Sequence, residues 1–236
     1  MRLLLALQSW AGPSVQRFED GLDEAFGLRW AEACAAEPYL ALDAIAVFQA
    51  SESGPVYGFL DAVPEAPSVP KPMVVCEDTE TRFFAPDAVS GLERLHELRQ
   101  EWDDDIDPRL SRWLRTELRT VPDRSMRWPP AELPAGYRYV HSADGFGIIA
   151  PNGAFDRTVL KGDPSLSISE HQEWATRLLH EGKPGSALLI LKDGLHVGRH
   201  SPSTWAGLGR ITAEAYLTLG RPAAAQRVRQ RSARRG

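Results

Sequence analysis

The sequence predicts an α+β fold: a small mixed or antiparallel sheet with flanking helices, followed by an all-helical hairpin pair. Two observations lead to this prediction. Over residues 1–102, short apolar or alternating segments bounded by turn residues are interspersed with helical periodicity. From residue 168 onward the periodicity is purely helical, and a break of glycine, a basic residue and proline interrupts it twice.

Residues 1–127 are expected to form an acidic α+β domain. The stretch MRLLLALQSW at residues 1–10 is a strand candidate. A helix is predicted from Ser14, which can cap it, to Pro38, which ends it. Its apolar stripe repeats at four-residue steps and comprises Phe18, Leu22, Phe26 and Trp30.

Four further strands are predicted at residues 42–51, 55–63, 73–77 and 81–85. The segment between the second and third of them carries four prolines in ten residues, so it is a loop. A helix over 87–102 should begin at the cap Asp87, with His96 on its solvated side. Its buried stripe should comprise Val89, Leu92, Leu95 and Leu98. A second helix should begin at the cap Asp107.

Residues 128–165 form a Pro/Gly-rich joint, and residues 166–236 form the helical hairpin pair. Within the joint, YRYV and FGIIA are predicted strands of a small hairpin turned by SADG. In the last segment, Gly182 and Gly220 hold the same place in two helical hairpins, about 38 residues apart. Each glycine precedes a basic residue and a proline.

The second hairpin carries a pattern of aromatic and small residues, namely Trp205, Leu208, Gly209, Ala213, Tyr216 and Ala224. Small residues allow paired helices to approach closely, and aromatic residues fill the gap to the next repeat. In this respect the last 70 or so residues resemble a pair of tetratricopeptide repeats. The period here is longer than the roughly 34 residues of that family.

The net charge of −5 is unevenly distributed. Residues 1–130 hold 13 basic and 23 acidic residues, whereas residues 131–236 hold 14 and 9. The acidic front favours a basic protein partner, and nucleic acid is not expected as a partner. The initial apolar run is too short for a secretory signal and no segment could span a membrane, so a cytoplasmic protein without membrane contact is expected. Cys34 and Cys76 are interpreted as core thiols.

The motifs that usually carry catalysis or cofactor binding are missing from the sequence. There is no phosphate-binding GxxxxGK[ST] loop, no GxSxG and no HExxH. His196 and His200 are four residues apart, but the intervening glycine makes a continuous helix doubtful, so a solvated pair is expected rather than a zinc site. Neither a metal nor another cofactor is therefore expected.

The strands and helix of residues 41–100 also resemble the core of the SUKH superfamily, which includes many bacterial immunity proteins. The matching segments are Val56-Tyr57-Gly58-Phe59, Pro72-Met73-Val74-Val75, and Ala85 through Leu92. The resemblance implies a binding protein rather than an enzyme. Bacterial members typically neutralise a partner toxin, often a nuclease.

Our leading hypothesis is an immunity protein that occludes the active site of a basic toxin. An acidic face would steer the encounter with such a partner. The candidate partner-binding residues are Glu77, Asp78 and Glu80 on one turn, and Glu101, Asp103, Asp104, Asp105 and Asp107 on another. Two alternatives remain open. One is a peptide-binding scaffold that uses groove residues such as Arg177 and Arg210; the other is an enzyme with a site around His141, Asp144 and His171.

Overall fold

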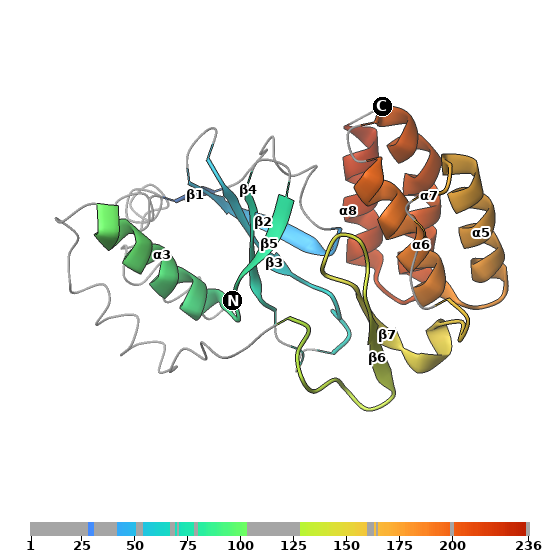
Figure 1. The fold of residues 1–236 in the computed structure, drawn as a ribbon, viewed down its shortest axis with the longest axis horizontal. Helices are drawn as coiled ribbons and strands as arrows, with labels where there is room; N and C mark the ends of the chain where they lie inside the picture. The colour runs from blue at the N-terminus through green and yellow to red at the C-terminus, as the bar shows by residue number, and fades with distance from the viewer. Residues whose placement is uncertain are drawn as a thin grey trace. The chain divides into compact units, whose positions relative to one another are not determined.

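The computed structural model describes residues 28–30, 42–50, 54–66, 69, 71–77, 80–102, 128–159, 163, 165–198 and 201–234. The chain divides into two compact units. Among the described residues, the first unit contains a five-stranded sheet and one helix, and the second contains a two-stranded sheet and four α-helices (Figure 1). The second unit also includes residues 41–43 and 61–69, which precede β2 and follow β3 in the chain. The α+β fold class is therefore confirmed.

The sheet of the first unit is antiparallel throughout, in the order β1-β2-β3-β4-β5. Its strands are β1 (Arg29–Trp30), β2 (Ala44–Gln49), β3 (Val56–Leu60), β4 (Met73–Glu77) and β5 (Glu80–Ala85). The last four confirm the predicted strands. The helix predicted across Trp30 is wrong at that residue, since Trp30 pairs with Phe48 of β2. Pairing with the edge of β2 satisfies the backbone there and overrides the local helical spacing.

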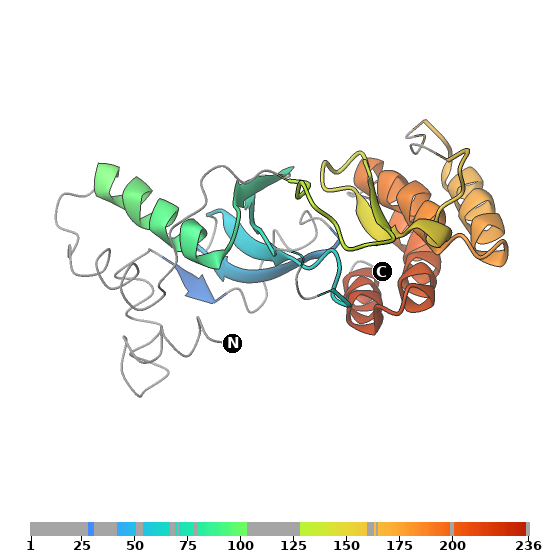
Figure 2. The same ribbon diagram turned by 90° about the horizontal axis from the view of Figure 1, so that it is seen from below.

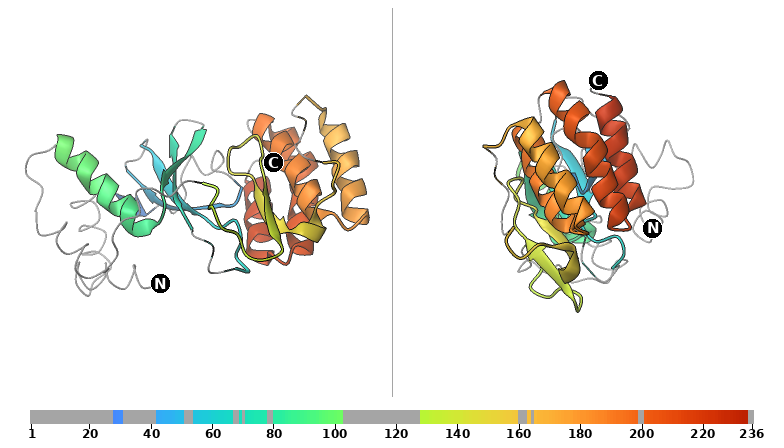
Figure 3. Two further views of the ribbon diagram at one scale, coloured as in Figure 1. Left: turned by 60° about the horizontal axis from the view of Figure 1, so that its bottom comes forward. Right: turned by 90° about the vertical axis from the view of Figure 1, so that its right-hand side faces the viewer.

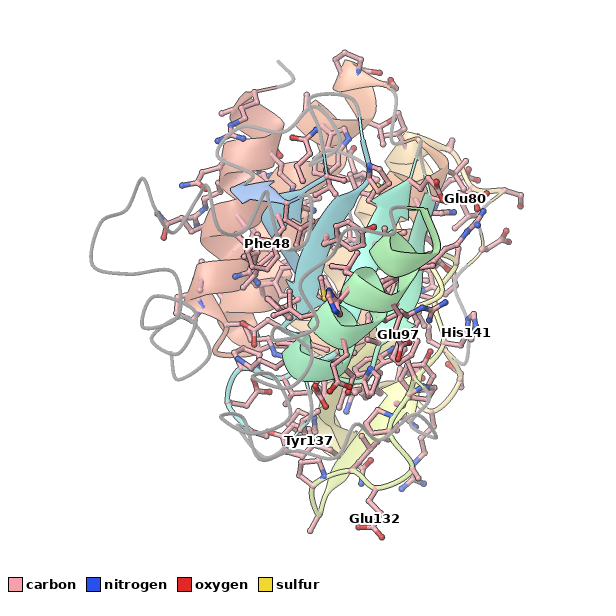
Figure 4. The ribbon with its side chains drawn as sticks, turned by 90° about the vertical axis from the view of Figure 1, so that its left-hand side faces the viewer. Phe48, Glu80, Glu97, Glu132, Tyr137 and His141 are labelled. Carbon is pink, nitrogen blue, oxygen red and sulfur yellow. The ribbon has the colours of Figure 1, made fainter. Side chains whose placement is uncertain are left out.

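Helix α3 (Ala88–Trp102) begins as predicted, because the Ser90 amide donates to Asp87 Oδ1 at 2.8 Å. Two of its predicted side-chain positions are wrong: His96 is only 2% exposed, whereas Leu98 is 37% exposed. The buried face is centred on Leu92, which packs in a core with Phe48 and Leu95 (Phe48 is labelled in Figure 4). At 3.6 residues per turn, His96 lies about 40° around the helix from Leu92, whereas Leu98 lies about 120° away.

The second unit begins with the hairpin of β6 (Tyr137–Val140) and β7 (Ile148–Pro151), followed by the short 3-10 helix η2 (Asn152–Ala154). Four helices follow: α5 (Ile168–His180), α6 (Pro184–Val197), α7 (Pro202–Thr218) and α8 (Pro222–Ala233). The predicted strand pair and the two helical hairpins are thus confirmed. Figure 2 shows β7 beside α6, and the right-hand view of Figure 3 shows the four helices side by side.

The same hinge closes both helical hairpins. Gly182 and Gly220 have φ of 69° and 76°, a conformation that glycine adopts without strain. The amides of the following residues, Lys183 and Arg221, reach back to the carbonyls of Leu178 and Tyr216, each at 2.8 Å. Both helices therefore end in a Schellman motif, and the internal repeat extends to backbone hydrogen bonds.

Cys76 is buried in β4 and forms no disulfide, as expected for a core thiol. Other sequence predictions lie outside the described residues: the strand at residues 1–10, the helix predicted between Ser14 and Pro38 apart from residues 28–30, the Val89 side chain, the helix that begins at Asp107, and the position of Cys34.

Candidate functional site

The described residues contain two of the predicted acidic partner-binding residues with their side chains. Glu77 and Glu80 are register partners at the β4–β5 turn, and both are exposed (Glu80 is labelled in Figure 4). Arg82 donates to Glu80 Oε2 at 2.8 Å, which offsets part of the acidic charge. The other candidates, Asp78, the Glu101 side chain, Asp103, Asp104, Asp105 and Asp107, lie outside the described residues.

The structure brings Arg177 and Arg210 together in one groove of about 520 Å³ between α5 and α7. These are the two residues that the scaffold hypothesis singled out. The other lining residues were not foreseen, and they are Gln172, Glu173, Thr176, His180 and Ile211. A signal for them exists in the sequence, because Glu173, Thr176, Arg177 and His180 follow helical spacing on one polar face of α5.

Helix α5 is held at its N-terminus by a capping box. The Glu170 amide donates to Ser167 Oγ, and the Ser167 amide donates to Glu170 Oε2 at 2.7 Å. Near the other end, His180 Nδ1 donates to the Thr176 carbonyl at 2.8 Å, which fixes the ring against its own helix. The groove face of α5 is therefore presented on a helix with defined ends.

The groove carries more positive than negative charge. Arg177 and Arg210 are both exposed, and Glu173 is the acidic side chain in the lining. Arg177 lies 4.0 Å from Glu181, a long and exposed contact that contributes little. Guanidinium groups bind carboxylates in a bidentate manner, and the buried Ile211 adds apolar surface beside them. The arrangement is suited to an extended segment that carries carboxylates.

A buried lysine connects several elements of the second unit. Lys192 of α6 is fully buried, and its three N–H donors reach three acceptors. These are Asp43 Oδ2 at 2.8 Å, Asp144 Oδ2 at 3.1 Å and the Gly147 carbonyl at 2.8 Å. The hydroxyl of Tyr216 donates to Asp43 Oδ1 at 2.6 Å. The network therefore joins residue 43, the β6–β7 turn, α6 and α7.

Opposing effects set the pKa values in this network. Burial alone raises the pKa of Asp43, but the charge and hydrogen bond of Lys192 and the Tyr216 hydroxyl together lower it below its ordinary value. Burial lowers the pKa of Lys192, but Asp144 and Asp43 outweigh that effect and raise it. Burial, followed by the Asp43 charge, raises the pKa of Tyr216 well above its usual value. Asp43 and Lys192 are thus both charged at neutral pH.

At the α7–α8 hinge, a second buried basic side chain is likewise held by a carboxylate and a backbone carbonyl. Arg221 binds Glu65 with two nitrogens, at 3.1 and 2.7 Å, and donates to the Ile149 carbonyl at 2.6 Å. Its counterpart in the first hairpin, Lys183, donates to the Gly153 carbonyl at 3.1 Å. The basic residue of each hinge thus holds the chain segment that carries β7 and η2.

The three residues of the histidine-centred enzyme hypothesis, His141, Asp144 and His171, differ in their surroundings. The Asp144 carboxylate is occupied by Lys192, the Ser142 hydroxyl and the Phe146 amide. His171 is buried and its Nδ1 bonds the Ser167 carbonyl, whereas His141 is exposed just after β6. Helix α6 ends at Val197, before His200. Over the described ranges, no group of three histidine, cysteine or acidic residues could hold a metal ion.

No family model matches the chain, and no curated protein matches it. Among the described helices, none has both the length and the apolar composition that a membrane span requires.

Proposed function

We propose that this chain is a protein-binding protein that holds an extended acidic segment of its partner in the groove between α5 and α7. The observation that carries the proposal is the convergence of Arg177 and Arg210 on one groove. Its lining comes from the first helix of each of the two hairpins. The resemblance of this part of the chain to tetratricopeptide repeats supports the same function.

The groove geometry sets the expected ligand. A volume of about 520 Å³ accommodates a few side chains rather than a folded domain. Two guanidinium groups favour two carboxylates on the ligand, and Ile211 favours an apolar side chain near them. Because a flexible peptide loses conformational entropy when it binds, a dissociation constant of about 1–100 μM is expected.

The test is selection of peptides from a randomised octapeptide library on the full chain, followed by fluorescence polarisation with the enriched sequences. The proposal expects the enriched peptides to be rich in Asp and Glu. Each single variant, Arg177→Gln and Arg210→Gln, should bind these peptides about tenfold more weakly than the wild type. Arg229→Gln is the matched control, since Arg229 is an exposed arginine of α8 outside the groove lining. Enrichment without acidic residues, or equal affinities in all three variants, would contradict the proposal.

The immunity hypothesis is a second proposal, supported by the exposed register pair of Glu77 and Glu80. In this proposal the β4–β5 turn of the first unit contacts a basic toxin, and the SUKH resemblance supports the assignment. Arg82 limits the acidic charge available at this turn, so residues beyond the described ranges would have to contribute to the contact.

A pull-down from host lysate at low and moderate salt, with mass spectrometry of the retained proteins, tests this second proposal. It expects one stoichiometric basic partner, retained by the wild type and lost from Glu77→Lys and Glu80→Lys together. A partner that is retained equally by the charge-reversed variant would overturn the assignment of this turn.

A further inference from the structure

The second unit contains another cavity, formed by β6, η2 and the start of α6. Its volume is about 670 Å³, and its lining is Arg138, Asn152, Gly153, Phe155, Asp156, Arg157 and Lys183. None of these residues lines the α5–α7 groove. The cavity includes the contact of Lys183 with Gly153 at the α5–α6 hinge, but it shares no residue with the Lys192 network, and the function proposed above does not use it.

Three of the lining side chains are cationic, Arg138, Arg157 and Lys183, and contacts position two of them, Arg138 and Lys183. The guanidinium of Arg138 lies over the Phe155 ring at 4.5 Å and donates to the Asp156 carbonyl at 3.3 Å. Its Nε is buried, yet among the described residues it has no hydrogen-bond acceptor. Lys183 Nζ uses one donor on the Gly153 carbonyl at 3.1 Å, which leaves its other two donors available.

The single carboxylate of the lining has its own partner. Asp156 Oδ1 accepts the Thr158 amide at 2.7 Å and the Thr158 hydroxyl at 2.6 Å. The Thr158 hydroxyl and then its amide lower the pKa of Asp156, so this carboxyl is ionised at neutral pH. Three cations and one carboxylate give the lining a net charge of +2.

The start of α6 adds to this positive potential. Lys183 is the N-cap residue of this 14-residue helix, and the positive end of the helix dipole lies at that terminus. The Asp156 amide donates to Ser186 Oγ at 2.9 Å, which ties the cavity loop to the first turn of α6. The cationic groups are therefore arranged on a fixed backbone rather than on a free loop.

We propose that this cavity binds the phosphate monoester of a small polar molecule. A phosphate monoester carries about −1.5 to −2 charge at pH 7, which matches the net charge of the lining. Arg138 and Arg157 supply planar donors that suit phosphate oxygens, and Lys183 supplies a point charge. A cavity of about 670 Å³ is much larger than a phosphate ion, so it leaves room for a sugar or a base attached to the phosphate.

The test is a titration of the isotope-labelled full chain, followed by NMR. The probes are inorganic phosphate, ribose 5-phosphate and a phosphoserine tetrapeptide. The expected result is saturable shifts of the Gly153 and Arg157 amides, with ribose 5-phosphate bound at least about tenfold more tightly than inorganic phosphate. In Arg157→Gln and in Lys183→Gln the affinity should fall about tenfold, which corresponds to 1.4 kcal/mol.

Arg229→Gln again serves as the control, because it removes one positive charge from the same unit outside the cavity lining. Circular dichroism of each variant separates loss of binding from loss of folding. Absence of saturable shifts with all three probes would overturn the proposal. So would an equal loss of affinity in the control, or tighter binding of the phosphopeptide than of ribose 5-phosphate.

Discussion

Replacing Asp43 by asparagine should strongly destabilise the second unit. The change keeps the size of the side chain but removes one of the two carboxylates that hold Lys192. At an effective dielectric constant of about 20, a charge pair at the observed 2.8 Å attracts by roughly 6 kcal/mol before desolvation is counted. Removing one partner of a buried pair typically costs about 3–5 kcal/mol, because the remaining charge loses its compensation.

Asp43→Asn should lower the free energy of unfolding by about 3 kcal/mol. This is the lower end of that range, because Asp144 and the Gly147 carbonyl still hold the ammonium group of Lys192. A loss of this size is a large fraction of the usual 5–15 kcal/mol of a folded domain. For a unit of this size, it should lower the melting temperature by more than about 10 °C.

Urea denaturation, monitored by hydrogen exchange of the α6 amides, measures this loss in the second unit alone. Glu132→Gln is the control, since Glu132 is exposed in the same unit (labelled in Figure 4). Adding Lys192→Met to Asp43→Asn should recover part of the loss, because no buried ammonium group remains. If Asp43→Asn stays within about 1 kcal/mol of the wild type, the network does not stabilise the unit as argued here.

Three further predictions concern the same unit. The pKa of Asp43 is lowered in the folded state, so the stabilisation that its carboxylate provides is present above the unfolded pKa of about 3.9 and is lost as the pH falls below that value. In an acid titration, the free energy of unfolding should therefore depend less on pH in Asp43→Asn than in the wild type. Gly182→Ala and Gly220→Ala should each lower the free energy of unfolding by about 1 kcal/mol, because alanine is strained at a positive φ. Urea denaturation measures this loss, and an unchanged midpoint would contradict the role of the two glycines in the hinges. A fragment of residues 129–236 lacks Asp43 and Glu65, so its α6 amide hydrogens should exchange with solvent faster than those of the full chain. Equal exchange rates in the fragment and the full chain would refute this prediction.

The elements that the sequence predicted well are those in which local periodicity and tertiary packing agree. The strands at 73–77 and 81–85 and the helical hairpins after residue 168 belong to this group. Trp30 shows the opposite case, because helical spacing at that residue yields to pairing with Phe48. His96 shows that a correct helix does not fix which of its residues are buried, since the position of the sheet decides that.

The candidate site was only partly predictable for the same reason. Arg177 and Arg210 could be named from helical spacing, but their convergence depends on the packing of α5 against α7. The cavity around Arg138 and Lys183 had no signal, because its residues come from a strand, a turn and a helix start that carry no common motif.

The sequence by itself determined the fold class, the repeated hinge and the alternation of strands and helices, because these depend on residues close together in the chain. Only the tertiary structure decided that Asp43 belongs with Lys192 and Tyr216, which are 149 and 173 residues away. In the sequence, Asp43 is an acidic residue at the start of a strand, and Lys192 is one charge in an apolar helix. The low dielectric constant of a shared interior makes each of them depend on the other, and no local pattern encodes that dependence.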